Sequence, residues 1–133
     1  MRILYSLGIN VYVFLITLAA LFGNKKAKLW RKGRKGLMKV YESYFSEKDP
    51  WTYIWIHVSS LGEFEQGRPL IEAIKERYPN QKILLTFFSP SGYEIRKDYP
   101  YADYIQYLPA DRFFAMSKLV QLIRPKVALF IKY

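Results

Sequence analysis

Residues 51–78 read WTYIWIHVSSLGEFEQGRPLIEAIKERY, and this stretch decides the fold. Trp51–Val58 is rich in aromatic and β-branched residues and is too short to span a membrane, so it predicts a buried strand. From Phe64 onward, apolar residues recur at the spacing of one helix face. Open α/β sheets bind ligands at such a strand–turn–helix junction, outside the carboxyl end of the strand. Glu63 follows the Ser/Gly turn and is therefore the first candidate for chemistry.

The rest of the globular part repeats the alternation of strand and helix. Further strands are predicted at Lys82–Phe88, Asp103–Leu108 and Lys126–Tyr133, a loop at Ser89–Gly92, and helices at Tyr93–Tyr99 and from Pro109–Asp111, with Asp111 as cap. This alternation predicts a parallel sheet with right-handed crossovers, a Rossmann-like α/β layer over residues 51–133. Pro69 leaves two interpretations open. Either the first helix kinks there, or Pro69 opens the main helix after a turn at residues 63–68.

The amino-terminal segment Ile3–Phe22 contains no charged residue. Its twenty residues would span roughly 30 Å as a helix, the thickness of a bilayer's hydrocarbon core. We interpret residues 1–23 as an uncleaved membrane anchor, which the positive-inside rule orients with residue 24 onward in the cytoplasm. A cleaved signal peptide and a membrane-associated helix that does not span are the alternatives, but no A-x-A site follows the apolar run.

The net charge of +10 is concentrated in one segment. Residues 24–41 contain eight Lys and Arg and no acid, which leaves +2 for the rest of the chain. Residues 24–50 are therefore interpreted as a basic juxtamembrane segment, with an amphipathic helix over Asn24–Ser46 and Trp30 at headgroup depth. The basic residues could equally serve only to fix topology. Nucleic-acid binding is disfavoured because the basic segment adjoins an apolar span.

Few residue types are available for chemistry. The chain has no cysteine and a single histidine, His57, which excludes thiolate metal sites and histidine-rich metal sites. A carboxylate at a strand–helix turn suits a general base, although Glu63 could instead only stabilise the helix start through the macrodipole. His57 could orient a substrate or be an ordinary core residue. Candidate ligand-binding residues, each with ordinary turn or surface roles as the alternative, are Ser59, Ser60, Gly62, Arg68, Ser89, Ser91, Gly92 and Lys132.

Three stretches together resemble the amino-terminal half of the lipid A Kdo transferases, where Kdo is 3-deoxy-D-manno-oct-2-ulosonic acid. They are HVSSLGEFEQGRPLIEAIKERYPNQKILLTFFSPSGYEIRK, DYIQYLPAD and IRPKVALFIKY. They carry, in order, the S-x-G-E turn at Ser60–Glu63, the Ser/Thr-Pro-Ser/Thr-Gly loop at Ser89–Gly92, and an R-P-K lead into the last strand. Each motif is weak alone, and the ordered set is specific.

The resemblance implies an inverting, metal-independent glycosyltransferase with two Rossmann-like domains (GT-B type) and no cofactor. CMP-Kdo would be the donor, the lipid A precursor the acceptor, and the cytoplasmic face of the inner membrane the location. By position, Glu63 would be the general base. A further acidic residue and the carboxyl-terminal donor domain of that family have no counterpart here, so we expect a fragment that is inactive alone. The competing hypothesis is a membrane-tethered, non-catalytic α/β module that binds an anionic lipid or a partner.

Overall fold

The computed structural model describes residues 2–132, with side chains from residue 4 onward. Within this range there are six helices and four strands. The first three elements are helices, and from β1 onward strands and helices alternate as the sequence predicts. They are α1 (Arg2–Leu21), α2 (Lys25–Arg34), α3 (Leu37–Phe45), β1 (Tyr53–Val58), α4 (Leu61–Arg77), β2 (Lys82–Phe87), α5 (Pro90–Arg96), β3 (Tyr104–Tyr107), α6 (Phe113–Ile123) and β4 (Val127–Ile131).

The four strands form one parallel sheet in the order β3-β2-β1-β4. The prediction of a parallel α/β layer is therefore confirmed. β1 and β2 lie inside the sheet and are almost entirely buried, which explains their continuous apolar sequences. β4 is an edge strand, and Phe130 is 54% exposed, so this strand is less buried than its apolar sequence suggests.

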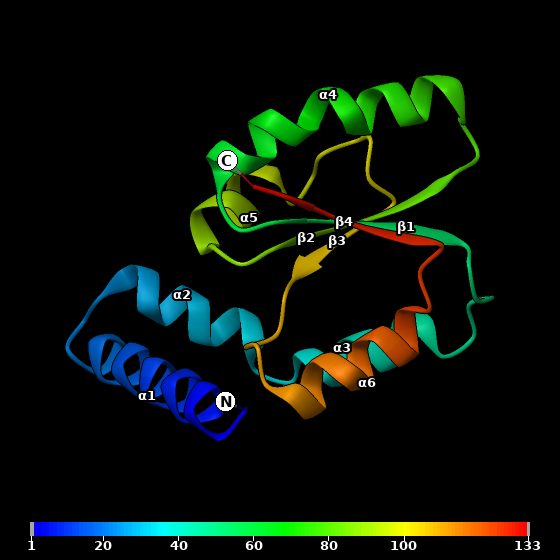
Figure 1. The fold of residues 1–133 in the computed structure, drawn as a ribbon. Coiled ribbons are helices and arrows are strands. Elements are labelled where there is room, and N and C mark those ends of the chain that lie inside the picture. The colour runs from blue at the N-terminus through cyan, green and yellow to red at the C-terminus, as the bar shows by residue number, and fades with distance from the viewer. Residues whose placement is uncertain (1, 133) are drawn as a thin grey trace.

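Helices cover both faces of the sheet (Figure 1). On one face, Phe64 and Ile71 of α4 pack against Ile56, Val58 and neighbouring residues of β2. On the other, α3 and α6 pack against Trp55 and residues around it. Alternate residues of each strand point to opposite faces, so each interior strand contributes to both cores.

The segment predicted as one interfacial helix over Asn24–Ser46 is two helices with different roles. Helix α2 ends at Arg34, and α3 begins after Gly36, whose φ of +69° lies in the left-handed region and interrupts the helix. After the break, Leu37, Tyr41 and Phe45 of α3 are buried in the core beside α6, and the Tyr41 hydroxyl donates to the Tyr107 carbonyl at 2.8 Å. Their spacing predicts one apolar helix face, and such a face can be covered by a sheet as well as by lipid. The interfacial interpretation of residues 37–45 is wrong.

Three local expectations also differ from the structure. α4 begins at Leu61 and runs through Pro69 as one helix, so a separate turn at residues 63–68 is excluded. The predicted loop at Ser89–Gly92 is the start of α5, with Pro90 at the first helical position, where its fixed φ fits and no N–H is required. α6 begins at Phe113, after Arg112, and Asp111 does not cap it. The Asp111 carboxylate instead accepts a hydrogen bond from the Tyr5 hydroxyl of α1.

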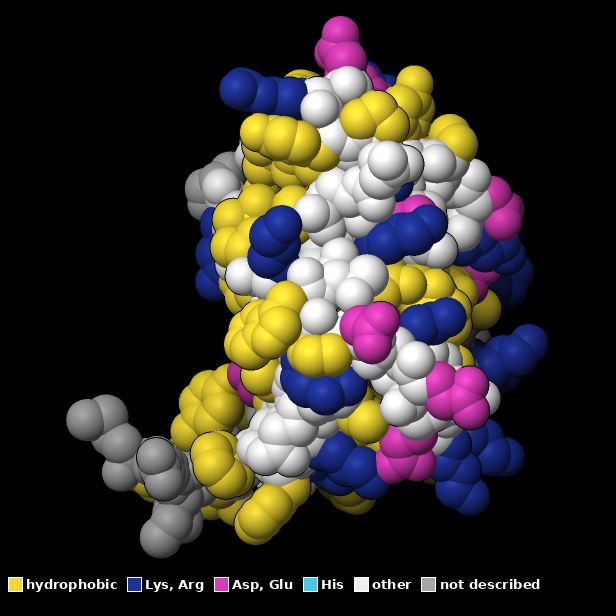
Figure 2. All heavy atoms as spheres, turned by 90° about the vertical axis from the view of Figure 1, so that its right-hand side faces the viewer, with side chains coloured by type: hydrophobic (Ala, Val, Ile, Leu, Met, Phe, Trp, Pro, Cys, Tyr) yellow, Lys and Arg dark blue, Asp and Glu magenta, His cyan; other side chains and the backbone are white. Residues whose placement is uncertain are grey.

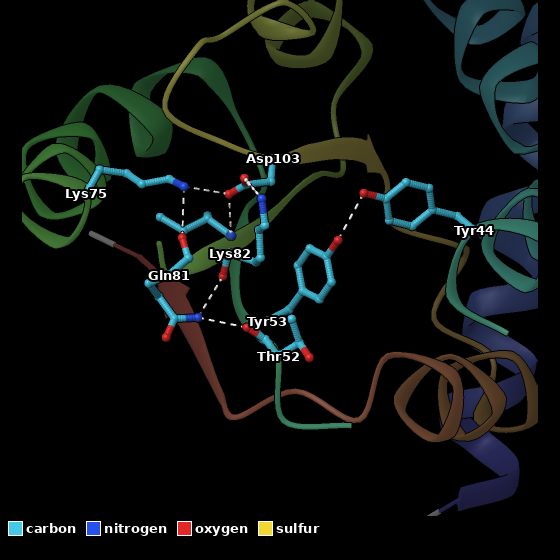
Figure 3. A network of polar contacts seen from close by, with 8 residues as sticks. Tyr44, Thr52, Tyr53, Lys75, Gln81, Lys82 and Asp103 are labelled. Atoms are coloured by element: carbon cyan, nitrogen blue, oxygen red, sulfur yellow. Dashed lines mark hydrogen bonds and ion pairs between the residues drawn. The ribbon is translucent and has the colours of Figure 1, made fainter. Parts of the chain in front are cut away.

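Polar contacts fasten the amino edge of the sheet (Figure 3). Asp103 accepts from Lys75 at 2.7 Å, Lys82 at 3.1 Å and the Ile83 N–H at 2.8 Å, which joins α4, β2 and the chain before β3. The Gln81 side chain donates to the Thr52 carbonyl at 2.8 Å. Figure 2 shows this side of the molecule, where basic and acidic side chains are interspersed among apolar ones. These contacts have a structural role and leave the opposite edge for ligands.

Helices α1 and α2 form an antiparallel pair next to the carboxyl ends of the strands (Figure 1). Within residues 2–132, α1 is the one helix long and apolar enough to cross a membrane by length and composition. Trp30 of α2 contacts Tyr12 of α1 and Phe88 after β2, with ring centroids 6.2 and 6.0 Å apart. Trp30 is only 6% exposed, so its side chain packs against protein rather than projecting to the surface. Its depth relative to a membrane stays a prediction.

Candidate functional site

Three adjacent strands end together at the carboxyl edge of the sheet. Val58, the last residue of β1, is paired with Phe87 of β2 and Ile131 of β4. The turns that follow β1 and β2 are also joined, because the Ser89 N–H donates to the Ser59 carbonyl at 2.9 Å. The parallel register therefore brings together Ser59, Ser60, Ser89 and Lys132, which lie far apart in sequence.

Glu63 is held in a defined position at the start of α4. The Ser60 side chain caps the helix by accepting the Glu63 N–H at 3.2 Å. In return, the Glu63 carboxylate, through Oε2, accepts the Ser59 N–H. This reciprocal arrangement is a variant of the capping box, and its S-x-x-E signature at Ser60–Glu63 was readable in the sequence. No hydrogen bond within the described residues engages the second carboxylate oxygen, Oε1.

Gly92 allows the start of α5 to approach the start of α4. A Cβ atom at residue 92 would lie 2.7 Å from Cδ1 of Phe87 and 3.2 Å from the backbone nitrogen of Leu61. Gly62, by contrast, has open space, with only Ser60 Oγ at 3.9 Å. The hydroxyl groups of Ser89 and Ser91 are hydrogen-bonded to each other at 2.7 Å on the exposed side of this junction. Gly92 thus brings these hydroxyl groups to the same edge as Glu63.

His57 lies in the core beneath this edge. It is 7% exposed, and its Nδ1 is 2.9 Å from Thr86 Oγ1, which also accepts the indole N–H of Trp55 at 2.9 Å. Burial lowers the pKa of His57 to about 4, so the imidazole is neutral at neutral pH. The charge of Glu63 opposes this shift and that of Lys132 adds to it. The geometry favours the core interpretation of His57 over a direct role with substrate.

Arg68 and Lys132 differ in their relation to the edge. Arg68 forms ion pairs along the exposed surface of α4, with Glu65 at 3.4 Å and Glu72 at 3.9 Å. Such pairs are those of an ordinary surface helix charge, and they do not bring Arg68 to Glu63. Lys132 directly follows β4, is exposed, and is close enough for its charge to act on His57. Lys132 therefore stays a candidate binding residue at the carboxyl edge, whereas Arg68 lies away from that edge.

Sequence reasoning missed Arg34, which joins the basic segment to this edge. Its guanidinium stacks 4.0 Å from the ring centroid of Trp30 and 4.7 Å from that of Phe88, and it donates to the Phe88 carbonyl at 2.8 Å. Burial lowers the pKa of Arg34 to about 10, and the guanidinium remains charged at neutral pH. Gly33 permits this packing, because a Cβ there would lie 2.2 Å from Cε2 of Tyr107. No local pattern distinguishes Arg34 from its seven basic neighbours.

A parallel sheet that carries a positioned carboxylate and several hydroxyl groups at its carboxyl edge belongs to the class of Rossmann-like α/β domains that bind ligands there. Comparison with known families narrows this class. Residues 24–133 match the family described as 3-deoxy-D-manno-octulosonic-acid transferase (kdotransferase), and the chain belongs to that family.

Curated relatives carry the name 3-deoxy-D-manno-octulosonic acid transferase. The chain is similar to those of Aquifex aeolicus (30% identical over 80 residues, 59% of this chain), Haemophilus influenzae (30% over 77 residues, 57%) and Rickettsia conorii (29% over 99 residues, 74%). The matched parts cover 22%, 18% and 21% of these relatives, about a fifth of their length. The activity of a whole transferase is therefore a proposal for this chain.

Proposed function

We propose that this chain is the acceptor-side half of an enzyme that transfers Kdo from CMP-Kdo to the lipid A precursor in lipopolysaccharide biosynthesis. Membership of the family supports the reaction class. The observation that carries the assignment of a site is the position of Glu63. Its carboxylate is fixed by the Ser59 N–H at the carboxyl edge of the sheet, with the hydroxyl groups of Ser60, Ser89 and Ser91 on the same edge.

In the proposed reaction, Glu63 accepts the proton of a sugar hydroxyl group of the acceptor. The hydroxyl oxygen then bonds to the anomeric carbon of Kdo, while the bond from that carbon to the phosphate oxygen of CMP breaks and its electron pair leaves with CMP. Attack from the side opposite the leaving group inverts the configuration, and the residues of this chain perform their part without a metal. A positioned general base of this kind typically contributes about 10²–10⁴-fold to the rate.

The donor would bind outside this chain. The proposal places CMP-Kdo on a second Rossmann-like domain of a GT-B-type enzyme, facing the carboxyl edge described above. Ser59, Ser60, Gly62, Ser89, Ser91, Gly92 and Lys132 are the proposed acceptor-binding residues, and Arg68 is the weakest of the predicted set because of its ion pairs. The 133-residue chain alone should therefore not catalyse transfer.

The proposed location is the cytoplasmic face of the inner membrane, with α1 as the anchor. The contacts of α1 support the non-spanning alternative, since Tyr12 packs on Trp30 of basic helix α2 and Tyr5 hydrogen-bonds Asp111. With these contacts intact, a crossing α1 would carry α2 into the bilayer, at about 2.5–3.5 kcal/mol per Lys or Arg at its centre. We infer that α1 lies along the membrane surface with exposed residues such as Leu7, Phe14 and Leu15 in the lipid.

A transfer assay tests this function. The complete polypeptide that contains these residues is incubated with CMP-Kdo and lipid A precursor in detergent, and the glycolipid product is identified by its mass. The proposal expects Kdo addition by the complete polypeptide and none by the 133-residue chain. Absence of product from the complete, folded polypeptide, with retained binding to anionic vesicles, would instead favour a non-catalytic membrane-tethered module.

A further inference from the structure

A cavity of about 380 Å³ lies between the α1–α2 pair and the segment after β2. This volume is within the range of sites for organic ligands and far exceeds the roughly 30 Å³ of a water molecule. Its walls are mainly apolar: Ile16 and Ala19 come from α1, Trp30 from α2, and Phe88 and Pro90 from the chain after β2. Such a lining suits a hydrocarbon chain better than a sugar or a nucleotide.

The two polar sides of the cavity point to a particular class of lipid. Lys26 of α2 lines it and takes part in no ion pair within residues 2–132. Lys26 also belongs to the acid-free basic segment at residues 24–41, so this side attracts an anionic headgroup. Ser89 lines the cavity as well, and its N–H is bonded to the Ser59 carbonyl at the site of Glu63. The cavity therefore shares Ser89 with the proposed acceptor site.

We propose that this cavity binds one acyl chain of the anionic glycolipid acceptor, with the sugar headgroup directed past Ser89 toward Glu63. The identity of the lipid rests on the proposed function, whereas the preference for a hydrocarbon chain rests on the cavity walls. The other face of α1 exposes Leu7 and Phe14, so the helix contacts membrane lipid on one side and the bound chain on the other. Helix α1 is then part of the acceptor site as well as an anchor.

Trp30 provides a second, independent observation. Its side chain is 6% exposed, and its indole N–H has no acceptor within the described residues. A buried donor without a partner is uncommon in native proteins. An acyl chain begins at an ester or amide carbonyl, which is the kind of acceptor that this indole lacks.

Photo-crosslinking tests the proposal without depending on activity. The 133-residue chain is reconstituted in vesicles with a trace of lipid A precursor that carries a diazirine at the end of one acyl chain, and the labelled residues are mapped by mass spectrometry. Labelling of Tyr12, Ile16 and Ala19 is expected. Ala19→Trp, which fills the cavity, should reduce it about tenfold. Leu7→Trp, on the opposite and exposed face of the same helix, is the matched control and should leave it unchanged.

The outcomes separate the cavity from the function. Labelling confined to Leu7, Phe14 and Leu15, or labelling unaffected by Ala19→Trp in a chain with unchanged circular dichroism, overturns the proposal. Ile16→Trp replaces Ala19→Trp if the latter disturbs folding. Equal cavity labelling by a diazirine-bearing phosphatidic acid overturns the glycolipid assignment. Transfer by the complete polypeptide without cavity labelling would support the proposed function and overturn the proposed acyl-chain site. Cavity labelling without transfer would support the acyl-chain site and overturn the proposed function.

Discussion

Replacing Gly92 by alanine tests how closely the two helix starts approach at the carboxyl edge. The new Cβ would lie 2.7 Å from Cδ1 and 3.1 Å from Cε1 of Phe87, and 3.2 Å from the Leu61 nitrogen. Phe87 cannot easily move, because it is completely buried and packs on Phe64 with ring centroids 5.7 Å apart. Leu61 contributes a backbone atom at the first residue of α4, which can shift only if the helix shifts.

The expected cost follows from two opposing effects. Overpacking a well-filled core typically costs about 1–3 kcal/mol, and replacing glycine by alanine within a helix returns up to about 1 kcal/mol. The net destabilisation should be about 1–2 kcal/mol, which lowers the midpoint of thermal unfolding by roughly 5–10 °C for a domain of this size. Thermal unfolding followed by circular dichroism at 222 nm, with the 133-residue chain in detergent, measures this shift.

Gly62→Ala is the matched control, because Gly62 also lies in the first turn of a helix at the same edge. Its Cβ would meet only Ser60 Oγ, at 3.9 Å, so the midpoint should be unchanged or slightly raised. Equal stability of the two variants would refute the close approach of α5 to α4. It would also remove one of the reasons for placing Ser89 and Ser91 beside Glu63, since the hydrogen bond from Ser89 to Ser59 is the other.

Three further predictions concern stability. Asp103→Asn should cost about 1–3 kcal/mol in urea unfolding because Lys75 loses its carboxylate partner. Burial favours a higher pKa for Asp103, but its hydrogen bonds to Lys75, Ile83 and Lys82 lower the pKa overall. The wild type should therefore lose stability below about pH 4 more steeply than this variant. Equal slopes of unfolding free energy against pH would contradict the role of Asp103 in this network. The pKa of His57 is near 4 in the folded chain and 6.5 in the unfolded chain, so the unfolded state binds the proton first as the pH falls. The free energy of unfolding should therefore decrease by up to about 3 kcal/mol between pH 6.5 and pH 4. His57→Gln should remove most of this pH dependence. Arg34→Lys should destabilise by about 1–3 kcal/mol, because it loses the planar stack on Trp30, whereas exposed Lys32→Ala should change stability by less than about 0.5 kcal/mol.

The strands and most helices were predictable because their signals are local. Interior strands β1 and β2 are apolar throughout since both faces are covered, and α4 is marked by its apolar spacing. The role of α3 was not predictable in this way. The spacing of Leu37, Tyr41 and Phe45 specifies a buried face, but only the tertiary structure shows that the sheet covers it.

The candidate site was predictable to the same extent. Ser60 and Glu63 are neighbours in sequence, and parallel strands bring Ser89 to them at the same edge. Arg34 is positioned by contacts with Phe88 and Tyr107, which lie more than fifty residues away in sequence. No local residue spacing predicts such contacts. Asp111 shows the reverse error, since a local capping signal was overridden by a hydrogen bond from Tyr5.

The central claim is that Glu63 is the general base, and kinetics of Glu63→Gln in the complete polypeptide test it most directly. Glutamine can still accept the Ser59 N–H and so preserve the start of α4, which unchanged thermal unfolding would verify. The measurement is kcat for Kdo transfer from CMP-Kdo to lipid A precursor at saturating concentrations of both. We predict a fall of about 10²–10⁴-fold with little change in the KM for CMP-Kdo. A kcat within a few-fold of wild type, in a variant of unchanged stability, would contradict the assignment.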